Sequence, residues 1–371
     1  MISFNFVLYL PFNLRYRTMH HIKISDQKQG FNATISIFSN KECHIMIEPA
    51  DFRADASSSI ASLEEGLENL LTSSQLSGFR PVFMRWFLSD IHAQKKLVRN
   101  NPDIPVSFIQ QPPMNGSKAV LWVWLMNDVS GNYEYIFRGD MHSDAEGSYK
   151  QMDEILKEYS TDLAKNGMNV AQNCVRTWIY VRDVDVNYSG IVKARRELFD
   201  GWGLTADTHY LASTGINGLN EVPSHLVCMD AYSVKGLKEE DVQYLHALEN
   251  LSPTHIYGVT FERGTAIRFS DRTQILISGT ASIDKNGKIV AEGDIRKQTE
   301  RTFVNIDALL KEAGAGFEDI AQMIVYIRDT ADYEQVRDYV ETHFPDIPKV
   351  ITWAPVCRPG WLVEVECIAY R

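Results

Sequence analysis

Two carboxylates near the C-terminal end of the chain have the spacing to do chemistry. Glu364 and Glu366 alternate with Val363 and Val365, so both carboxylates lie on one face of a predicted strand. A strand that faces solvent would show the same alternation. The apolar flanking residues favour burial instead, and a buried carboxyl has a raised pKa because burial disfavours its charged form. A carboxylic acid that keeps its proton near neutral pH is suited to general acid catalysis.

Arginines that could bind a substrate carboxylate lie near this pair in the sequence or in other segments. Arg358 lies between Cys357 and the carboxylates, and its planar fork can bind a carboxylate bidentately, although it could equally anchor a turn. Arg263, Arg195 and Arg328 are further candidates for the same role, and two of the four would suffice for a dianion. Arg328 is the weakest candidate, because the equivalent positions in the chain's internal repeats follow no strict rule.

Other candidate site residues have a structural interpretation beside the functional one. Cys357 has no histidine adjacent in the sequence to activate it, so we expect it to shape a pocket rather than to act as a nucleophile. Tyr257 is expected to be a core or wall aromatic first and a hydroxyl donor second. The backbone N–H groups of Ser213, Thr214 and Gly215 could cradle a carboxylate, or the segment could be a plain glycine turn.

Composition excludes several classes of function. The chain has 371 residues, 44% of them hydrophobic and 23% charged, as in ordinary globular proteins. Its net charge of −11 argues against a nucleic-acid partner, and an anionic substrate must then be met by locally placed arginines. The five cysteines are odd in number and scattered, which favours a reducing cytoplasm over disulfides or a zinc site.

No motif calls for a cofactor or a metal. The sequence contains neither a phosphate-binding glycine loop nor a dinucleotide fingerprint, and its histidines lack metal-ligand spacing. The apolar stretch near the N-terminus is too short to span a membrane and lacks the features of a signal peptide, so no membrane partner is expected. We treat residues 1–18 as an N-terminal extension, with Met19 as an alternative start.

The elements that position the candidate residues recur as one unit repeated three times. Each copy has an amphipathic helix, a strand that ends in Asp, a second helix and two closing strands, and the central strands align over 82–90, 175–183 and 324–329. The predicted boundaries are 19–128 for a degenerate unit 1, 129–254 for unit 2 with a connector helix at 235–249, and 255–371 for unit 3. The pattern predicts an α+β fold with helices packed on one face of each sheet.

Unit 3 resembles the Rid superfamily, also called YjgF/YER057c/UK114. The residues that carry the resemblance are 278–284, 293–295, 298–299, 305–306 and 363–369. The resemblance implies a chorismate-mutase-like unit, a small mixed sheet backed by two helices, in a family whose members form trimers. Three fused Rid-like units then imply a monomeric pseudo-trimer with unlike clefts and one active site per chain.

The resemblance also guides the choice of activity. Enamine and imine deaminases of this superfamily hold the substrate carboxylate with an arginine just after a proline in the penultimate strand, where this chain has Pro348-Lys349. Cys357-Arg358-Pro359 followed by Glu364 instead is similar to the chorismatase branch. That similarity implies hydrolysis of an enolpyruvyl ether to pyruvate and a ring alcohol, with Glu364 as the acid that protonates the vinyl methylene.

The expected partner is therefore a small carboxylated metabolite. The residues expected to bind it are Arg358, Arg263, Arg195, Tyr257, Cys357, Ser213, Thr214 and Gly215. Two alternatives stay open: a deaminase in which Arg358 or Arg263 replaces the missing arginine, and a non-catalytic metabolite-binding protein.

Overall fold

The computed structural model describes residues 18–99, 103–127 and 132–371, without the side chain of Tyr257. Apart from Thr18, the expected N-terminal extension lies outside the described residues, as does the predicted boundary at residue 128.

Units 1 and 3 have six-stranded sheets of the same strand order. The sheet of unit 1 has the order β1 (Met19–Asp26), β2 (Phe31–Phe38), β3 (Glu42–Pro49), β6 (Ala119–Met126), β4 (Arg80–Leu88) and β5 (Val106–Gln110). That of unit 3 has the order β11 (Val242–Leu245), β12 (Gly264–Arg268), β13 (Thr273–Ala281), β16 (Val363–Tyr370), β14 (Ile320–Ile327) and β15 (Lys349–Trp353). The repeated order follows from the repeated sequence pattern.

Unit 2 has a four-stranded sheet, because it lacks the first two strands of the other units. Its order is β7 (Glu134–His142), β10 (Val227–Lys235), β8 (Cys174–Val181) and β9 (Ala212–Asn217). In every unit the central strand pairs in parallel with the next strand and antiparallel with the closing strand. The three mixed sheets confirm the predicted α+β class and the three fused units.

Helices cover the outer face of each sheet. They are α1 (Ala56–Leu71) and the single turn α2 (Ile91–Gln94) in unit 1, α3 (Ser148–Lys165), α4 (Val170–Asn173) and α5 (Val184–Gly201) in unit 2, and α6 (Ile295–Glu312) and α7 (Tyr333–His343) in unit 3. Local chemistry sets the helix ends. Asp55 caps α1 by accepting from the Ser58 N–H, and Gly314 follows α6 at a φ of +75°.

Two predictions made from local pattern are wrong. The connector at 235–249 is not a helix: Val242–Leu245 forms β11, an edge strand paired with β12, so the third sheet begins before residue 255. The plain glycine turn, one of the two interpretations left open for the segment around Gly215, is also wrong, because Ala212–Asn217 is the strand β9 alongside β8. In both segments pairing with a neighbouring strand outweighs local propensity.

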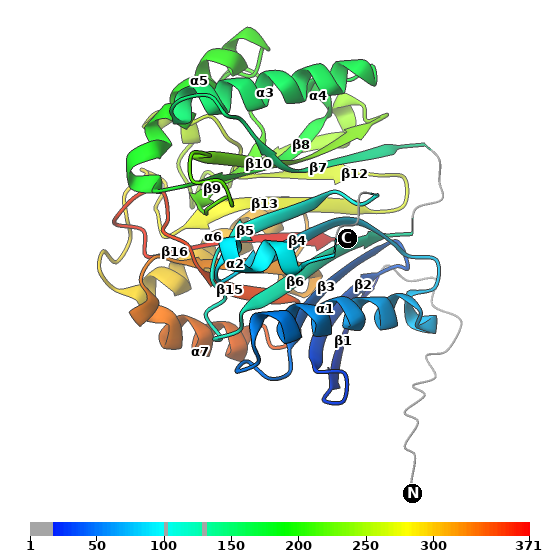
Figure 1. The fold of residues 1–371 in the computed structure, drawn as a ribbon. Helices are drawn as coiled ribbons and strands as arrows, with labels where there is room; N and C mark the ends of the chain where they lie inside the picture. Colours follow the sequence, from blue (N-terminus) through cyan, green and yellow to red (C-terminus); the bar gives the residue numbers. More distant parts are fainter. Residues whose placement is uncertain (1–17, 100–102, 128–131) are drawn as a thin grey trace, which may run out of the picture.

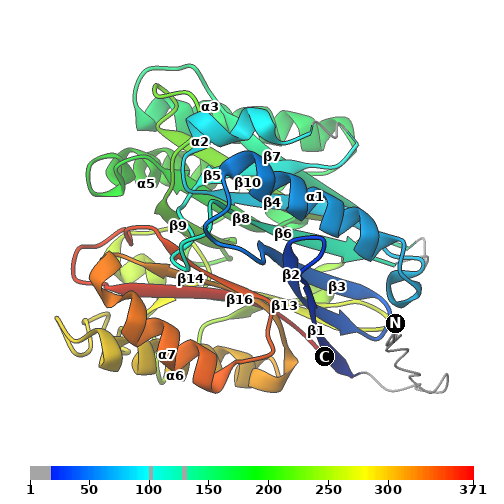
Figure 2. The same ribbon diagram turned by 60° about the horizontal axis from the view of Figure 1, so that its bottom comes forward.

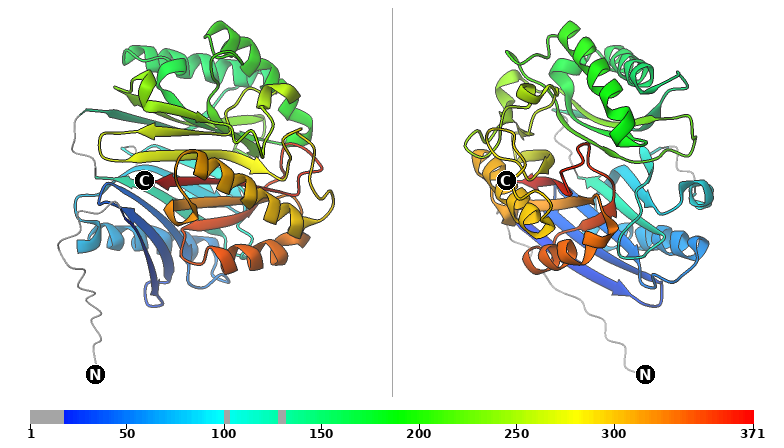
Figure 3. Two further views of the ribbon diagram at one scale, coloured as in Figure 1. Left: turned by 180° about the vertical axis from the view of Figure 1, so that it is seen from behind. Right: turned by 90° about the vertical axis from the view of Figure 1, so that its left-hand side faces the viewer.

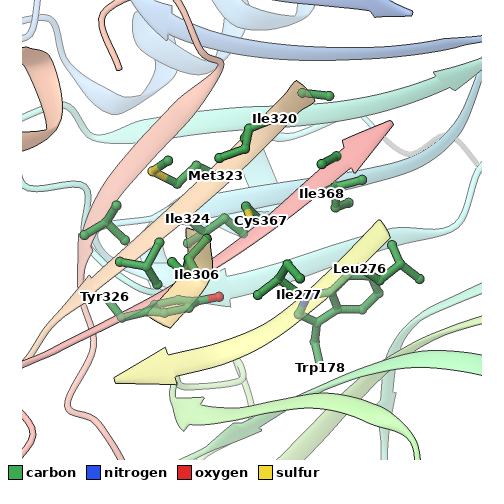
Figure 4. Close-up of a cluster of buried hydrophobic side chains, with 14 of the residues drawn as sticks. Trp178, Leu276, Ile277, Ile306, Ile320, Met323, Ile324, Tyr326, Cys367 and Ile368 are labelled. Carbon is green, nitrogen blue, oxygen red and sulfur yellow. The ribbon is translucent and has the colours of Figure 1, made fainter. Parts of the chain in front are cut away.

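The three sheets face one another in the middle of the molecule, and the helices lie outside them (Figures 1 and 2). A single cluster of buried apolar side chains joins residues of all three units. Figure 4 shows part of it, with Trp178 of unit 2 beside Leu276 and Ile277 of unit 3. The end-on view in Figure 3 shows the three sheets around this common centre, as a pseudo-trimer requires.

A buried ion pair lies in each seam between units. The pairs are Arg85–Asp230 between units 1 and 2 (3.0 Å), Arg176–Glu366 between units 2 and 3 (2.8 Å), and Arg272–Glu42 between units 3 and 1 (2.8 Å). None of these side chains is more than 4% exposed. A buried charge without its partner is costly, so the docking of two units depends on both charged residues of the pair between them.

No helix in the described part of the chain is long and apolar enough to cross a membrane.

Candidate active site

A small cavity lies at the seam between units 2 and 3. Its volume is about 30 Å³, room for about two water molecules. It is lined by Tyr188, Arg195, Ser213, Gly215, Val259, Phe261, Arg263, Gly279, Ala281, Ile283, Cys357, Arg358, Trp361 and Glu364. Seven of the nine residues expected from the sequence are among these, brought together from α5, β9, β16 and the segments before β12 and β16.

Glu364 is the acidic group of this cavity. It lies on β16 opposite Tyr326 of β14 and Ala281 of β13, and it is 4% exposed. Burial raises the pKa of Glu364 to about 8, with a further contribution from the nearby charge of Glu366. The carboxyl accepts no hydrogen bond from the described residues, so its proton can be given to a molecule in the cavity.

Gly279 makes room for this carboxyl. The pairing of β13 with β16 skips a residue between Ile277 and Thr280, which is the mark of a β-bulge. A Cβ atom at Gly279 would lie 2.1 Å from Oε1 of Glu364. Any side chain at this position would therefore push the carboxyl out of its present place.

We expect Gly279→Ala to lower activity sharply while the protein still folds, because the added methyl displaces the reacting carboxyl and not the backbone. The matched control is Gly201→Ala, at the end of α5, where an added Cβ meets no atom within 4 Å. Turnover and thermal unfolding of both variants check this. An active Gly279→Ala would mean that the position of the carboxyl is not critical.

Arg195 reaches the cavity from α5 of unit 2. It is 7% exposed and donates to the Ser213 hydroxyl (3.0 Å) and to the Thr260 carbonyl (2.8 Å). Its Nε has no hydrogen-bond partner among the described residues. Burial lowers the pKa of Arg195 to about 10, which still leaves it charged at neutral pH. A buried cation with an unused donor suits an anionic ligand.

The other two arginines lie on irregular segments that form the walls. Arg263 is 3% exposed, donates to the Ser252 carbonyl (3.0 Å) and lies over the Phe261 ring at 5.3 Å. Arg358 lies over the Trp361 ring at 5.5 Å. Aromatic contacts of this kind fix guanidinium groups in place. With Arg195, the cavity thus brings three cations close to one carboxyl that is neutral below pH 8.

Cys357 lines the cavity, and burial raises the pKa of its thiol to about 12. A thiol that keeps its proton at neutral pH is a poor nucleophile, so its chemistry fits the expected role in shaping the pocket.

Two expected binding residues remain, and of these Thr214 is not among the described residues that line the cavity. Thr214 instead hydrogen bonds to Glu366 and accepts from Arg176 at 2.6 Å, within the buried network of the seam. Tyr257 ends the short 3₁₀ helix Thr254–Tyr257, and its side chain lies outside the described residues. Arg328, the weakest arginine candidate, bonds to the Val356 carbonyl and to Asp185.

Tyr188 and Gly279 are lining residues that were not singled out from the sequence. The ring of Tyr188 lies so close to Gly215 that a Cβ there would be 2.9 Å from Cε2. A lone tyrosine on a helix gives no sequence signal, so only the tertiary fold reveals it. Gly279 was part of the Ser-Gly-Thr motif, whose spacing alone did not show that Glu364 needs the space.

Matching positions in the other units do not carry the acid. The residue opposite the aromatic of the central strand is Glu364 in unit 3, Cys228 in unit 2 and Val120 in unit 1. The chain therefore places a carboxylate at this position in the cleft of β16 alone. A valine or a buried cysteine cannot replace a carboxylic acid that is neutral at pH 7.

The seam between units 1 and 2 is filled at the place that corresponds to the cavity. Asp140 takes the bulge position of Gly279, because the register of β7 with β10 shifts there in the same way. Its carboxylate bonds to Lys95 at 3.2 Å and to Asn220 at 2.9 Å, and Lys95 also pairs with Glu221. The Lys95–Asp140 ion pair therefore fills the place in the seam of units 1 and 2 that is a cavity in the seam of units 2 and 3.

A larger hollow of about 780 Å³ lies beside α1 in unit 1. Two of its three cations, Lys95 and Arg99, are already paired, with Asp140 and Glu221 and with Glu64 and Glu68, and most of its other lining is apolar. Its carboxylates Glu64, Glu68 and Glu221 are engaged in these ion pairs, whereas Glu364 accepts no hydrogen bond from the described residues, so the smaller cavity is the better candidate for chemistry.

Comparison with known proteins agrees with the three-unit description. A family model described as endoribonuclease L-PSP matches residues 265–371. A RutC family protein of Pyrococcus abyssi is 32% identical over 99 residues, which cover 26% of this chain and 78% of that protein. The 3-aminoacrylate deaminase RutC of Acinetobacter baylyi is 26% identical over 98 residues, again 26% of this chain and 78% of the relative.

A solved structure is similar over most of the chain. A chorismatase crystal structure aligns with 80% of this chain and 96% of its own, with a TM-score of 0.61 and 18% identity. At that identity the likeness establishes a shared fold and leaves the reaction to be argued from the site.

Proposed function

The chain belongs to the Rid superfamily through its third unit, and from that premise we propose that it is a hydrolase that cleaves an enolpyruvyl ether of the chorismate type. The observation that carries the proposal is the Glu364 carboxyl, whose pKa of about 8 keeps it protonated, in a cavity with Arg195, Arg263 and Arg358. Such a site offers one proton and several carboxylate-binding groups. The chorismatase-like fold supports it.

The chemistry of an enol ether matches these groups. Glu364 gives its proton to the vinyl methylene carbon, which leaves an oxocarbenium carbon next to the ether oxygen. Water adds to that carbon, and the Glu364 carboxylate takes up the proton that the water loses. The hemiketal then loses its hydroxyl proton as it breaks the bond to the ring oxygen, and that oxygen takes up a proton, which gives pyruvate and a ring alcohol. The arginines hold the carboxylates of the substrate in place, because a guanidinium binds a carboxylate bidentately.

Binding of a ring substrate requires the cavity to open. At about 30 Å³ it holds about two water molecules, far less than a ring with two carboxylates needs. Arg358 and Trp361 belong to the segment between β15 and β16, while Phe261 and Arg263 lie between the 3₁₀ helix and β12. These segments have fewer strand contacts than the sheets and are the walls that can separate.

The direct test is pyruvate release. We expect purified protein incubated with chorismate to form pyruvate, measured with lactate dehydrogenase and NADH, and an equal amount of Glu364→Gln protein to form it at least about 100-fold more slowly. If the wild-type protein at high concentration forms no more pyruvate than the Glu364→Gln control, chorismate is not a substrate.

The similarity to a named 3-aminoacrylate deaminase supports a second candidate, hydrolysis of imines or enamines. In that reaction an arginine of this cavity would have to replace the missing one. Lys349, at the expected position after Pro348, is committed to the Phe344 and Pro345 carbonyls and to Glu341. If the rate of ammonia release from 2-aminoacrylate falls in both Arg358→Ala and Arg263→Ala, this candidate is favoured. If neither change affects the rate, neither arginine replaces the missing one.

A further inference from the structure

The buried pair at the seam of units 2 and 3 lies directly behind the proposed acid. Glu366 follows Glu364 by two residues on β16, so both carboxyl groups lie on the same face of the strand. Glu366 accepts from Arg176 Nη2 (2.8 Å), from Trp178 Nε1 (2.7 Å) and from the Thr214 hydroxyl. The Glu366 carboxylate is thus engaged in a buried ion pair with Arg176 and in hydrogen bonds with two further donors.

All three donors come from unit 2, whereas Glu366 and Glu364 belong to unit 3. Arg176 and Trp178 lie on β8, and Thr214 lies on β9. The Thr214 hydroxyl also accepts from the Gly279 N–H (2.9 Å), the residue against which the Glu364 carboxyl rests. The network therefore connects the fixed charge of Glu366, the bulge under Glu364 and the docking of the two units.

Resting on the hydrolase function proposed above, we propose that Glu366, held by Arg176, is a positioning residue that keeps the proton on Glu364. The Glu366 anion makes a second negative charge on the same strand face unfavourable, so Glu364 stays neutral. Arg176 fixes that anion in place and at the same time limits its effect. Neither residue touches the substrate; both act through Glu364.

The groups that face Glu364 decide the direction of the effect. They are Glu366 on β16, Tyr326 on β14, Arg176 on β8, Tyr188 and Arg195 on α5, Arg263 before β12, and Cys357 and Arg358 before β16. After burial, the charge of Glu366 is the largest influence that raises the pKa of Glu364, whereas Arg263 and then Arg176 lower it. Removal of Glu366 therefore favours ionisation of Glu364.

The test uses the full chain and two variants. Glu366→Gln removes the anion and leaves Arg176 charged, so the titration of Glu364 is expected at lower pH than in the wild type. The double variant Arg176→Met with Glu366→Gln removes both charges and avoids an unpaired buried cation, so it folds more readily, and its titration is expected between the other two. Infrared difference spectra against Glu364→Gln protein follow the C=O band of the protonated carboxyl with pH.

The pH profile of pyruvate release gives a second readout. The pH at which the rate begins to fall moves with the pKa of Glu364. At a fixed pH above that point, the rate falls about tenfold for every pH unit by which the pKa of Glu364 is lowered. The infrared titration needs no substrate, so a protein that releases no pyruvate from chorismate refutes that substrate, while the infrared titration alone decides the positioning role. A purely structural pair would alter stability and leave the titration where it is.

The matched control is the buried pair of another seam. The double variant Arg272→Met with Glu42→Gln removes a comparable pair between units 3 and 1, away from Glu364. It is expected to leave the Glu364 titration unchanged. Titrations that stay at the wild-type pH in both Glu366 variants would overturn the proposal, as would an equal movement in the control.

Discussion

Replacement of Glu364 by Gln is expected to reduce the rate of pyruvate formation by about 100- to 10,000-fold, the usual contribution of a general acid. Glutamine has nearly the same shape and fits against Gly279 in the same way, but its amide cannot supply the proton. The effect is expected in kcat rather than in KM, because the arginines that bind substrate are unchanged. Steady-state kinetics with the lactate dehydrogenase assay measure both constants.

The pH profile of the wild-type protein should show the same group. The pKa of Glu364 is raised to about 8, and the acid acts in its protonated form, so the rate is expected to be constant below that pH. Above it the rate falls tenfold for each pH unit. A rate that rises with pH between 7 and 9 would mean that the group works as a base, and the assignment of Glu364 as the acid would be wrong.

The same ionisation predicts that Glu364→Gln, which lowers activity, raises the stability of the protein at alkaline pH. The folded protein holds the Glu364 proton more tightly than the unfolded chain, whose pKa is near 4.5. The stability contributed by this proton is complete below pH 4.5 and is lost as pH rises towards about 8. Glu364→Gln protein is therefore expected to unfold at a higher temperature than the wild type at pH 8, and at a similar one at pH 4.5. Calorimetry at the two pH values measures this.

Replacement of Arg195 by Ala is expected to lower kcat/KM by roughly 30- to 150-fold, which corresponds to the loss of about 2 to 3 kcal/mol from a charge-assisted hydrogen bond. Arg195 belongs to unit 2, whereas Glu364 belongs to unit 3, so a large effect would demonstrate a site built from two units. The loss is expected mainly in KM if the arginine binds substrate equally in the ground state and the transition state.

Lys193→Ala provides the matched control for Arg195→Ala. Lys193 lies on the same helix, is 66% exposed and pairs loosely with Glu197 at 4.0 Å. Removal of this cation should leave kcat/KM within twofold of the wild type, since exposed pairs contribute little. Equal losses in the two variants would point to a general effect of charge on α5, and full activity of Arg195→Ala would exclude it from substrate binding.

The sequence predicted the fold class, and it brought the candidate residues of the site to attention, because both depend on patterns of residue type and spacing. Hydrophobic periodicity marked α1, α3 and α6, and the central strands aligned on their terminal Asp residues. The alternation of Glu364 and Glu366 with valines placed both carboxylates on one face before any coordinates were known. Local pattern failed at Val242–Leu245 and at Ala212–Asn217, where the partner strand that decides the structure is distant in the sequence.

The tertiary structure alone decided how the residues of the site differ in role. The two carboxylates look alike in the sequence, yet Glu366 is paired with Arg176 across the seam while Glu364 faces the cavity without a hydrogen bond from the described residues. Likewise Gly279 matters only because Oε1 of Glu364 lies against it. Residue type and spacing determine which groups are available, whereas pKa and access depend on which neighbours the folded chain brings within a few ångströms.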